Sequence, residues 1–106
     1  MTEDELLRCC MEMAKALGWR CLHIEPARIR KRGVETYRTP VSGDGKGWVD
    51  LYLLRDHPEH WECKDETGEL NGDQIAWRDA LLAASQVWRL VRPADWTSGH
   101  VEAWLR

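Results

Sequence analysis

The sequence predicts an α/β fold in which helices flank a mixed central sheet. Two stretches, residues 3–17 and 72–84, place apolar side chains at helical spacing. Four shorter runs of alternating or β-branched and aromatic residues, bounded by turn-forming residues, are typical of strands. The predicted order is helix, three strands, helix, strand, helix, and this order packs helices against a mixed sheet.

The length and composition indicate one soluble domain, residues 1–106. A chain of 106 residues can form one core but not a catalytic domain plus a separate recognition domain. We find no apolar run long enough for a membrane span and no signal peptide, so we expect no membrane partner. The four cysteines show no C-x-x-C spacing, which favours reduced, mostly buried thiols in the cytoplasm.

The first predicted helix begins at Thr2 as N-cap, Glu5 completes a capping box, and Gly18 ends it. Its apolar stripe consists of five residues: Leu6, Cys10, Met13, Ala14 and Leu17. On a helical wheel Glu3 lies within this stripe and Glu5 outside it. An acid at the end of a buried stripe needs a partner or a metal, so Glu3 is the functional candidate. A first-turn acid that complements the helix dipole is the competing interpretation.

Residues 19–24 are predicted to form a strand, and residues 28–47 a mobile basic loop. Between Arg28 and Lys46 six basic side chains stand against two acidic ones, although the whole chain has a net charge of −3. The basic residues are Arg28, Arg30, Lys31, Arg32, Arg38 and Lys46. This distribution suits phosphate contact and equally an ordinary solvated loop. Gly43-x-Gly-x-Gly47 lacks the ending of a phosphate loop, which favours a flexible linker.

Residues 47–64 are predicted to form a hairpin with its turn at residues 56–59. Alternation along a strand places Glu62 and Lys64 on one face and Cys63 on the other. If the hairpin is centred on residue 56 or 57, Asp50 lies opposite Glu62 or Lys64, within roughly 4.5–8 Å. Two carboxylates and an ammonium on one face suit a hard divalent cation. The alternative is a solvated cluster of surface charges.

The second predicted helix begins at Asn71, with Gln74 in the capping-box position. Two roles are open for Gln74, as the capping partner of Asn71 or as a functional group that holds a water or phosphate near Lys64, and the two are compatible. A strand at residues 86–91 and a short helix from about residue 98 complete the fold. His57 and His60 are assigned to the hairpin turn as exposed side chains, with no third metal ligand in view.

Several of these features together resemble the PD-(D/E)XK nuclease superfamily, and within it the small VRR-NUC nucleases. The features are Asp50, the hairpin, Glu62-Cys63-Lys64, and Gln74 followed by Trp77 and Leu81. The resemblance extends from Glu3 to about Val91 and departs from the family at Val49, where members have proline. It implies a restriction-endonuclease-like αβββαβ core.

The resemblance also implies a metal-dependent endonuclease that hydrolyses DNA phosphodiester bonds. Asp50 and Glu62 would hold Mg²⁺ or Mn²⁺ together with the Cys63 carbonyl, and Glu3 would complete the site directly or through water. Lys64 would orient the attacking hydroxide, while Gln74 would support Lys64 or a phosphate. The basic residues 28–46 would contact the DNA backbone.

Small stand-alone, phage-type members of the family resemble Holliday-junction resolvases. This implies branched DNA as substrate, a homodimer, and the cytosol of a bacterial or phage-infected host. A chain with no separate recognition domain also suits shape-selective binding. One alternative is a nuclease acting on linear DNA or RNA, in defence or as a toxin. Another is a catalytically silent nucleic-acid-binding module of the same fold.

Overall fold

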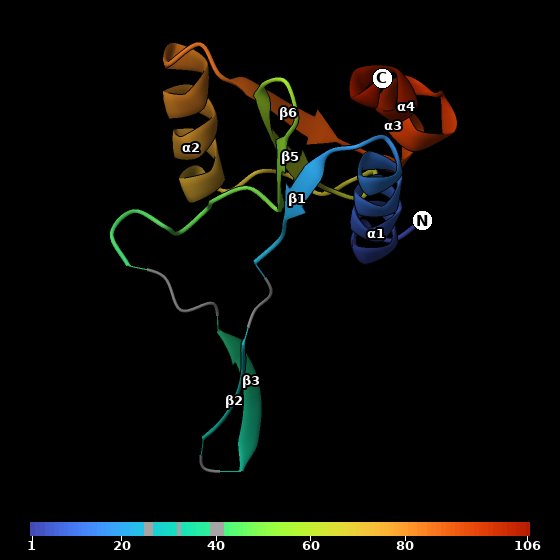
Figure 1. Ribbon diagram of the computed structural model, residues 1–106. Helices are drawn as coiled ribbons and strands as arrows, with labels where there is room; N and C mark the ends of the chain where they lie inside the picture. The colour runs from blue at the N-terminus through green and yellow to red at the C-terminus, as the bar shows by residue number, and fades with distance from the viewer. Residues whose placement is uncertain (25–26, 32, 39–41) are drawn as a thin grey trace.

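Residues 1–24, 27–31, 33–38 and 42–106 are described by a computed structural model, which has an α/β architecture (Figure 1). One mixed sheet has the strand order β1 (Arg20–Leu22), β4 (Leu51–Leu54), β5 (Pro58–Cys63) and β6 (Val87–Val91). The pairs β1–β4 and β4–β5 are antiparallel, and β5–β6 is parallel. The predicted α/β class with a mixed sheet between helices is therefore confirmed.

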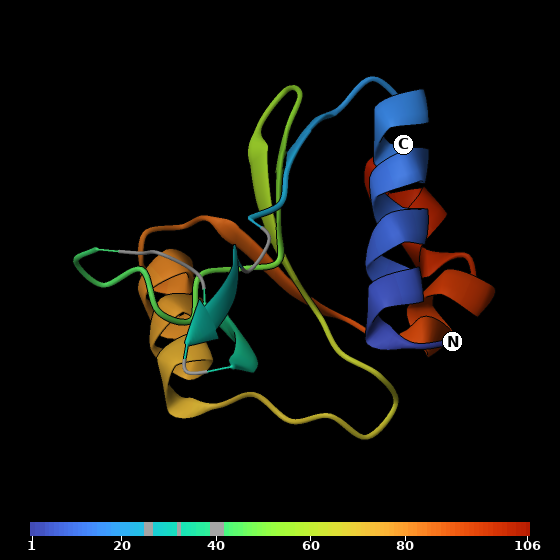
Figure 2. The same cartoon turned by 90° about the horizontal axis from the view of Figure 1, so that it is seen from below.

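Helices cover the two faces of the sheet unequally. Figure 2 shows α2 on one side of the sheet and the other three helices on the opposite side. The helices are α1 (Glu3–Ala16), α2 (Gly72–Ala83), α3 (Pro93–Thr97) and α4 (His100–Leu105). Among the described residues, no helix combines the length and the apolar character that crossing a bilayer requires. The crossover through α2 joins the parallel strands β5 and β6, as parallel neighbours require.

The core lies between the sheet and the helices α1 and α4. Strand positions that alternate toward α1 are fully buried, among them Leu51, Leu53 and Trp61. Leu6 and Cys10 of the predicted α1 stripe are also fully buried. The remaining core members come mainly from α1, the strand ends and α4: Leu7, Ala14, Trp19, Cys63, Val91, Val101 and Leu105.

The helix ends follow the predicted capping chemistry. The Thr2 hydroxyl accepts from the Glu5 amide at 3.1 Å, and Gly18 follows α1 with a φ of 88°. Asn71 and Gln74 form the complete capping box of α2, with both bonds at 2.9 Å. At α1 the reciprocal bond differs from the prediction, because the Glu5 carboxylate accepts from the Thr2 hydroxyl.

The segment predicted as a loop contains two antiparallel strands, β2 (Ala27–Lys31) and β3 (Val34–Arg38). Their pairing leaves a two-residue connection that includes Gly33, whose φ of 75° suits a tight hairpin turn. In Figure 1 this hairpin lies apart from the four-stranded sheet. The β-branched and aromatic run 34–37 carried a strand signal that the surrounding charges obscured.

The first strand and the hairpin turn are shorter than predicted. Strand β1 covers residues 20–22 instead of 19–24. Pro58 and Glu59, assigned to the turn, are the first residues of β5, where Pro58 pairs with Leu54. Proline is tolerated as the first residue of a strand, so Pro58 does not end the pairing. His60 consequently lies inside β5 and is buried, contrary to the prediction of an exposed turn histidine.

Candidate active site

The register of β4 and β5 brings Asp50 and Glu62 together. Leu51 pairs with Trp61, so one further step along both chains places Asp50 opposite Glu62. This is the hairpin centred on residue 56, one of the two predicted registers. The Asp50 Oδ2 atom accepts from the Cys63 amide at 2.9 Å, which fixes that carboxylate at the end of β5.

Glu62 is only 2% exposed, which excludes the alternative of a solvated surface charge. Within the described part of the chain, no donor reaches its buried Oε2 atom. The neighbouring carboxylate of Asp50 can hydrogen-bond to Glu62 only if a proton lies between the two. Burial, this shared hydrogen bond and the negative charge of Asp50 raise the pKa of Glu62 to about 9, against the opposing charge of Lys64.

Gln74 connects the second helix to this carboxylate. Its Nε2 atom donates to Glu62 Oε1 at 3.0 Å, while its Oε1 atom accepts from the Asn71 amide. The predicted capping role of Gln74 is confirmed, and its amide in addition holds Glu62. The side-chain hydrogen bonds of Gln74 join it to Asn71 and Glu62, and not to Lys64.

Glu3 lies at the same end of the sheet, although its side chain is largely exposed. Together with Asp4, Leu7 and Asp50 it lines a cavity of about 240 Å³. Partial burial and the charge of Asp50 raise the pKa of Glu3, and Lys64 opposes this rise. The structure thus places Glu3 beside the carboxylate pair, and Glu5 at the cap of α1.

Lys64 follows β5, and the loop of residues 65–68 turns back so that Gly68 lies beside the Lys64 side chain. Its amide donates to the Val91 carbonyl at 3.0 Å. The Asp65 carboxylate accepts from the Gly68 amide at 2.6 Å, and a Cβ added to Gly68 would lie 3.4 Å from Lys64 Cδ. Arg92 donates to the Asp65 carbonyl at 2.6 Å. The turn at Asp65 could be predicted from the sequence, because its hydrogen bonds are local. The contact of Arg92 could not, because it joins residues that are 27 positions apart.

His23 also contacts the site, although no local pattern in the sequence indicates it. Its Nδ1 atom donates to the Asp50 carbonyl at 2.6 Å. A carbonyl oxygen can only accept, so Nδ1 carries the proton in this contact. Because 27 residues separate His23 from Asp50, only the pairing of β1 with β4 could have revealed it.

The basic candidates are distributed over the hairpin and the segment after it. Arg28, Arg30 and Lys31 lie in β2, and Arg38 lies in β3. Arg32 lies outside the described residues. Lys46 is exposed and follows a turn that packs on α2, since Trp77 Nε1 donates to the Lys46 carbonyl at 3.1 Å.

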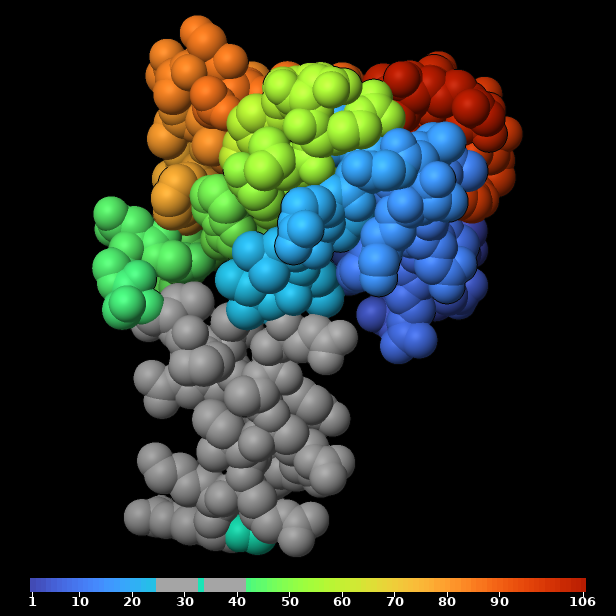
Figure 3. Space-filling view, viewed as in Figure 1, coloured from blue at the N-terminus to red at the C-terminus, as the bar shows by residue number. Residues whose placement is uncertain are grey.

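Gly47 belongs to a close contact and not to the flexible linker that its spacing suggested. Its φ is 81°, and a Cβ at this position would lie 2.4 Å from the backbone carbon of Asp73. Figure 3 shows the segment around residues 42–47, in green, against the N-terminal part of α2. The glycine therefore permits the chain entering β4 to approach the start of α2.

Glu59 is a second buried acid, which the sequence places in the turn but the structure places in β5. Its Oε1 atom accepts from Trp61 Nε1 and Arg89 Nε, both at 2.9 Å, and its Oε2 atom bonds to His57 at the same distance. Burial raises the pKa of Glu59, but these three hydrogen bonds outweigh burial and lower it. His57 is half-exposed and bound to Glu59.

All four cysteines are free thiols. Cys10 and Cys63 are buried as expected, whereas Cys9 and Cys21 are half-buried. A hydrogen bond with Cys10, together with burial, strongly raises the pKa of Cys63. The Cys63 thiol thus faces the core, and its backbone amide contacts Asp50.

The fit of a divalent cation depends on the carboxylate pair. No three His, Cys, Asp or Glu side chains converge as a metal-binding group in the ranges that the structure describes. Asp50 and Glu62 nevertheless fit such an ion, because one buried oxygen of Glu62 lacks a donor and the pair repels itself when ionised. A bound cation would contact the oxygen that lacks a donor and would reduce the repulsion between the two carboxylates.

Comparison of the chain with protein-family models, with curated proteins and with solved structures gave no match.

Proposed function

We propose that this protein is a Mg²⁺- or Mn²⁺-dependent endonuclease that hydrolyses DNA phosphodiester bonds. The observation that carries the proposal is the buried Glu62, with one unpartnered oxygen, next to the half-buried Asp50 and near the ammonium of Lys64. Placing a second acid beside a buried acid costs stability, and a bound cation would offset this cost. The order α, three strands, α, strand in the main sheet supports the restriction-endonuclease-like core that the sequence resembles, with β2–β3 as an insertion.

Each residue of the site has its own role in the proposed reaction. Asp50 and Glu62 would hold the cation with the Cys63 carbonyl, and Glu3 would reach it directly or through water. The chemistry supplied by a bound cation would be a water molecule of lowered pKa and positive charge beside the phosphoryl oxygens. Lys64 would orient the attacking hydroxide.

Three neighbours fix this geometry. Gln74 holds Glu62, the Cys63 amide holds Asp50, and Arg92 holds the loop beside Lys64. The arrangement presents the carboxylates before the substrate arrives, which is the condition for efficient electrostatic catalysis.

The substrate we propose is branched DNA, cut by a homodimer in the manner of a Holliday-junction resolvase. The β2–β3 hairpin bears Arg28, Arg30, Lys31 and Arg38, and a basic hairpin suits contact with the phosphate backbone. Such contacts position DNA without reading its sequence, which suits recognition of shape. The cytosol is the proposed location.

The test is cleavage of a labelled four-way junction beside its linear arms and an RNA copy, with Mg²⁺, Mn²⁺ or EDTA. We expect metal-dependent cutting of the junction, reduced roughly a hundredfold or more by Asp50→Asn and by Lys64→Ala. The matched controls are Asp79→Asn and Lys15→Ala, which change exposed side chains on α2 and α1. Circular dichroism checks that each variant folds.

The other outcomes separate the alternatives. Equal cutting of linear DNA or RNA would retain the nuclease and reject the preference for junctions. Tight binding without cutting under any metal would favour a silent nucleic-acid-binding module. A monomer at the concentration of full activity would reject the homodimer.

A further inference from the structure

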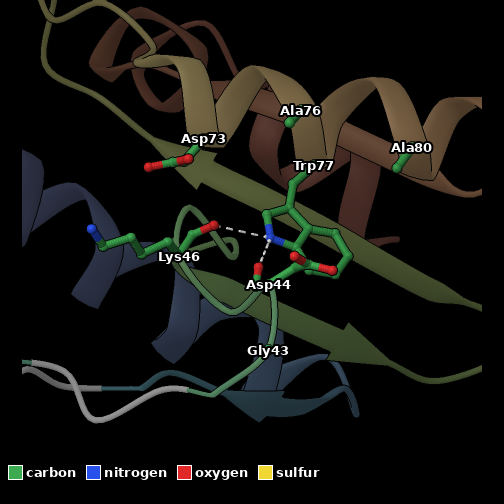
Figure 4. A pocket seen from close by; sticks show the side chains of 7 residues that line it. All are labelled: Gly43, Asp44, Lys46, Asp73, Ala76, Trp77 and Ala80. Carbon is green, nitrogen blue, oxygen red and sulfur yellow. Dashed lines mark hydrogen bonds between the residues drawn. The ribbon is translucent and has the colours of Figure 1, made fainter.

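A second cavity, outside the carboxylate site, lies between the turn at residues 43–46 and the surface of α2. Its volume is about 450 Å³, within the roughly 300–1,000 Å³ typical of small-ligand sites. Figure 4 shows its lining, which combines one indole ring, two small side chains and three charged groups. The lining residues are Gly43, Asp44, Lys46, Asp73, Ala76, Trp77 and Ala80.

The indole of Trp77 is held in one orientation. Its Nε1 atom donates to the carbonyls of Asp44 at 2.8 Å and Lys46 at 3.1 Å. Trp48 packs edge-to-face against it, with ring centroids 4.8 Å apart. The ring is half-buried and borders the cavity. A fixed aromatic ring loses little entropy when a flat ligand stacks on it, and stacking is how proteins hold unpaired bases.

The remaining lining complements a base that carries N–H groups. Ala76 and Ala80 lie one helical turn apart and leave space on the surface of α2 (Figure 4). The carboxylates of Asp44 and Asp73 are acceptors for amino and ring N–H groups. Lys46 supplies a positive charge for a phosphate. An arginine side chain would also suit the two acids, but Lys46 would repel it.

The cavity is connected to the carboxylate site by two short segments. Gly47 packs directly on the backbone of Asp73, and the next residue, Gln74, donates to Glu62. Lys46 lies four residues before Asp50. The cavity and the carboxylate site therefore share the start of α2 and the segment that leads into β4.

We propose that the cavity formed by Trp77, Ala80 and the 43–46 turn binds one unpaired nucleobase of the DNA substrate. The inference rests on the proposed nuclease function and extends it. A base can enter only where it is not stacked in a duplex, as at a junction, a flap or a single strand. Bases with an amino group, guanine above all, satisfy the two carboxylates, whereas thymine has a single N–H.

The test is calorimetric titration of dGMP and dTMP into the metal-free protein in EDTA, with NMR of the indole N–H signals. We expect dGMP to bind at least about fivefold more tightly than dTMP. Ala80→Leu fills the cavity and should weaken dGMP binding at least about tenfold. The matched control, Ala83→Leu, makes the same change at an exposed position of α2 outside the cavity and should leave binding unchanged.

Three results would overturn the inference: no dGMP binding to the folded protein, equal binding by the Ala80→Leu variant, or tighter binding of arginine amide than of dGMP. Because the titration uses no metal, it is independent of cleavage. Junction cleavage without dGMP binding would reject the cavity alone. Selective dGMP binding without cleavage would retain the cavity and reject the nuclease.

Discussion

Glu59 and Glu62 lie three residues apart on β5 and are equally buried, each 2% exposed, yet they differ in every polar contact. Glu59 accepts from an indole, a guanidinium and an imidazole, and its pKa is lowered. Glu62 has one amide donor and a carboxylate neighbour, and its pKa is raised to about 9.

The difference separates an acid whose polar contacts are complete from one that, among the described residues, keeps a buried oxygen without a donor. The odd spacing turns Glu59 toward the α1 side of the sheet, where Arg89 also stacks on Trp104 with 4.6 Å from Cζ to the ring centroid. Glu62 faces α2, beside Asp50. A buried carboxylate whose oxygens all accept hydrogen bonds stabilises the fold. A buried carboxylate with too few donors destabilises it, and a bound cation would remove that cost.

The largest expected contrast is in cleavage. Glu62→Gln preserves size and the bond from Gln74 but removes the charge, so we expect metal-dependent cutting to fall roughly a hundredfold or more. Glu59→Gln should leave the rate per folded molecule within about threefold, because Glu59 lies on the other face of the strand. Single-turnover cleavage of the junction measures both. Equal losses of cleavage rate in the two variants would contradict the proposal that Glu62, and not Glu59, acts in cleavage.

The second contrast is in how stability depends on pH. The raised pKa of Glu62 means that the folded protein keeps a proton that the unfolded chain releases above about pH 4.5. The free energy of unfolding of the metal-free protein should therefore fall as pH rises from about 4.5 to about 9, by at most about 1.4 kcal/mol per pH unit. Urea denaturation in EDTA at pH 5 to 8 measures this, and Glu62→Gln should flatten the profile. A wild-type profile that is already flat would contradict it.

The third contrast has the opposite sign. The lowered pKa of Glu59 contributes stability above about pH 4.5, and this contribution is lost as pH falls through the folded-state pKa. Glu59→Gln should cost about 2 kcal/mol at pH 7, since it weakens charge-assisted hydrogen bonds. Its effect should shrink toward pH 3. Chemical denaturation at the two pH values checks this, with the exposed Glu66→Gln as control.

The sequence was sufficient to predict α1, α2 and the strands of the main sheet, but not β2, β3 or α3. It was also sufficient to predict the approach of Asp50 to Glu62, because two registers of one hairpin both allowed it. It was also sufficient for the capping box of Gln74, a contact within four residues. It was insufficient for the burial of Glu62, which depends on β6 and α2 packing beside β5.

Charges were the main source of error. Glu59 and His60 looked like solvated turn residues beside Pro58, but the parallel neighbour β6 supplies Arg89 and the Val87 carbonyl to satisfy them. Contacts between segments separated by about 30 residues leave no local pattern. The basic run after residue 27 likewise concealed the alternation that forms β2 and β3.

The smallest predicted effect concerns His23, which holds the carbonyl of Asp50 much as Arg89 holds Glu59. Asparagine places an amide nitrogen near the position of Nδ1, so His23→Asn should keep the bond that His23→Leu removes. We expect the leucine variant to lose about 1 kcal/mol of stability and severalfold in cleavage rate, and the asparagine variant to retain most of both. Urea denaturation and cleavage from pH 6 to 9 test this. If His23 only positions Asp50, the asparagine variant keeps the wild-type pH profile; a changed profile would instead mean that the imidazole itself exchanges protons during the reaction.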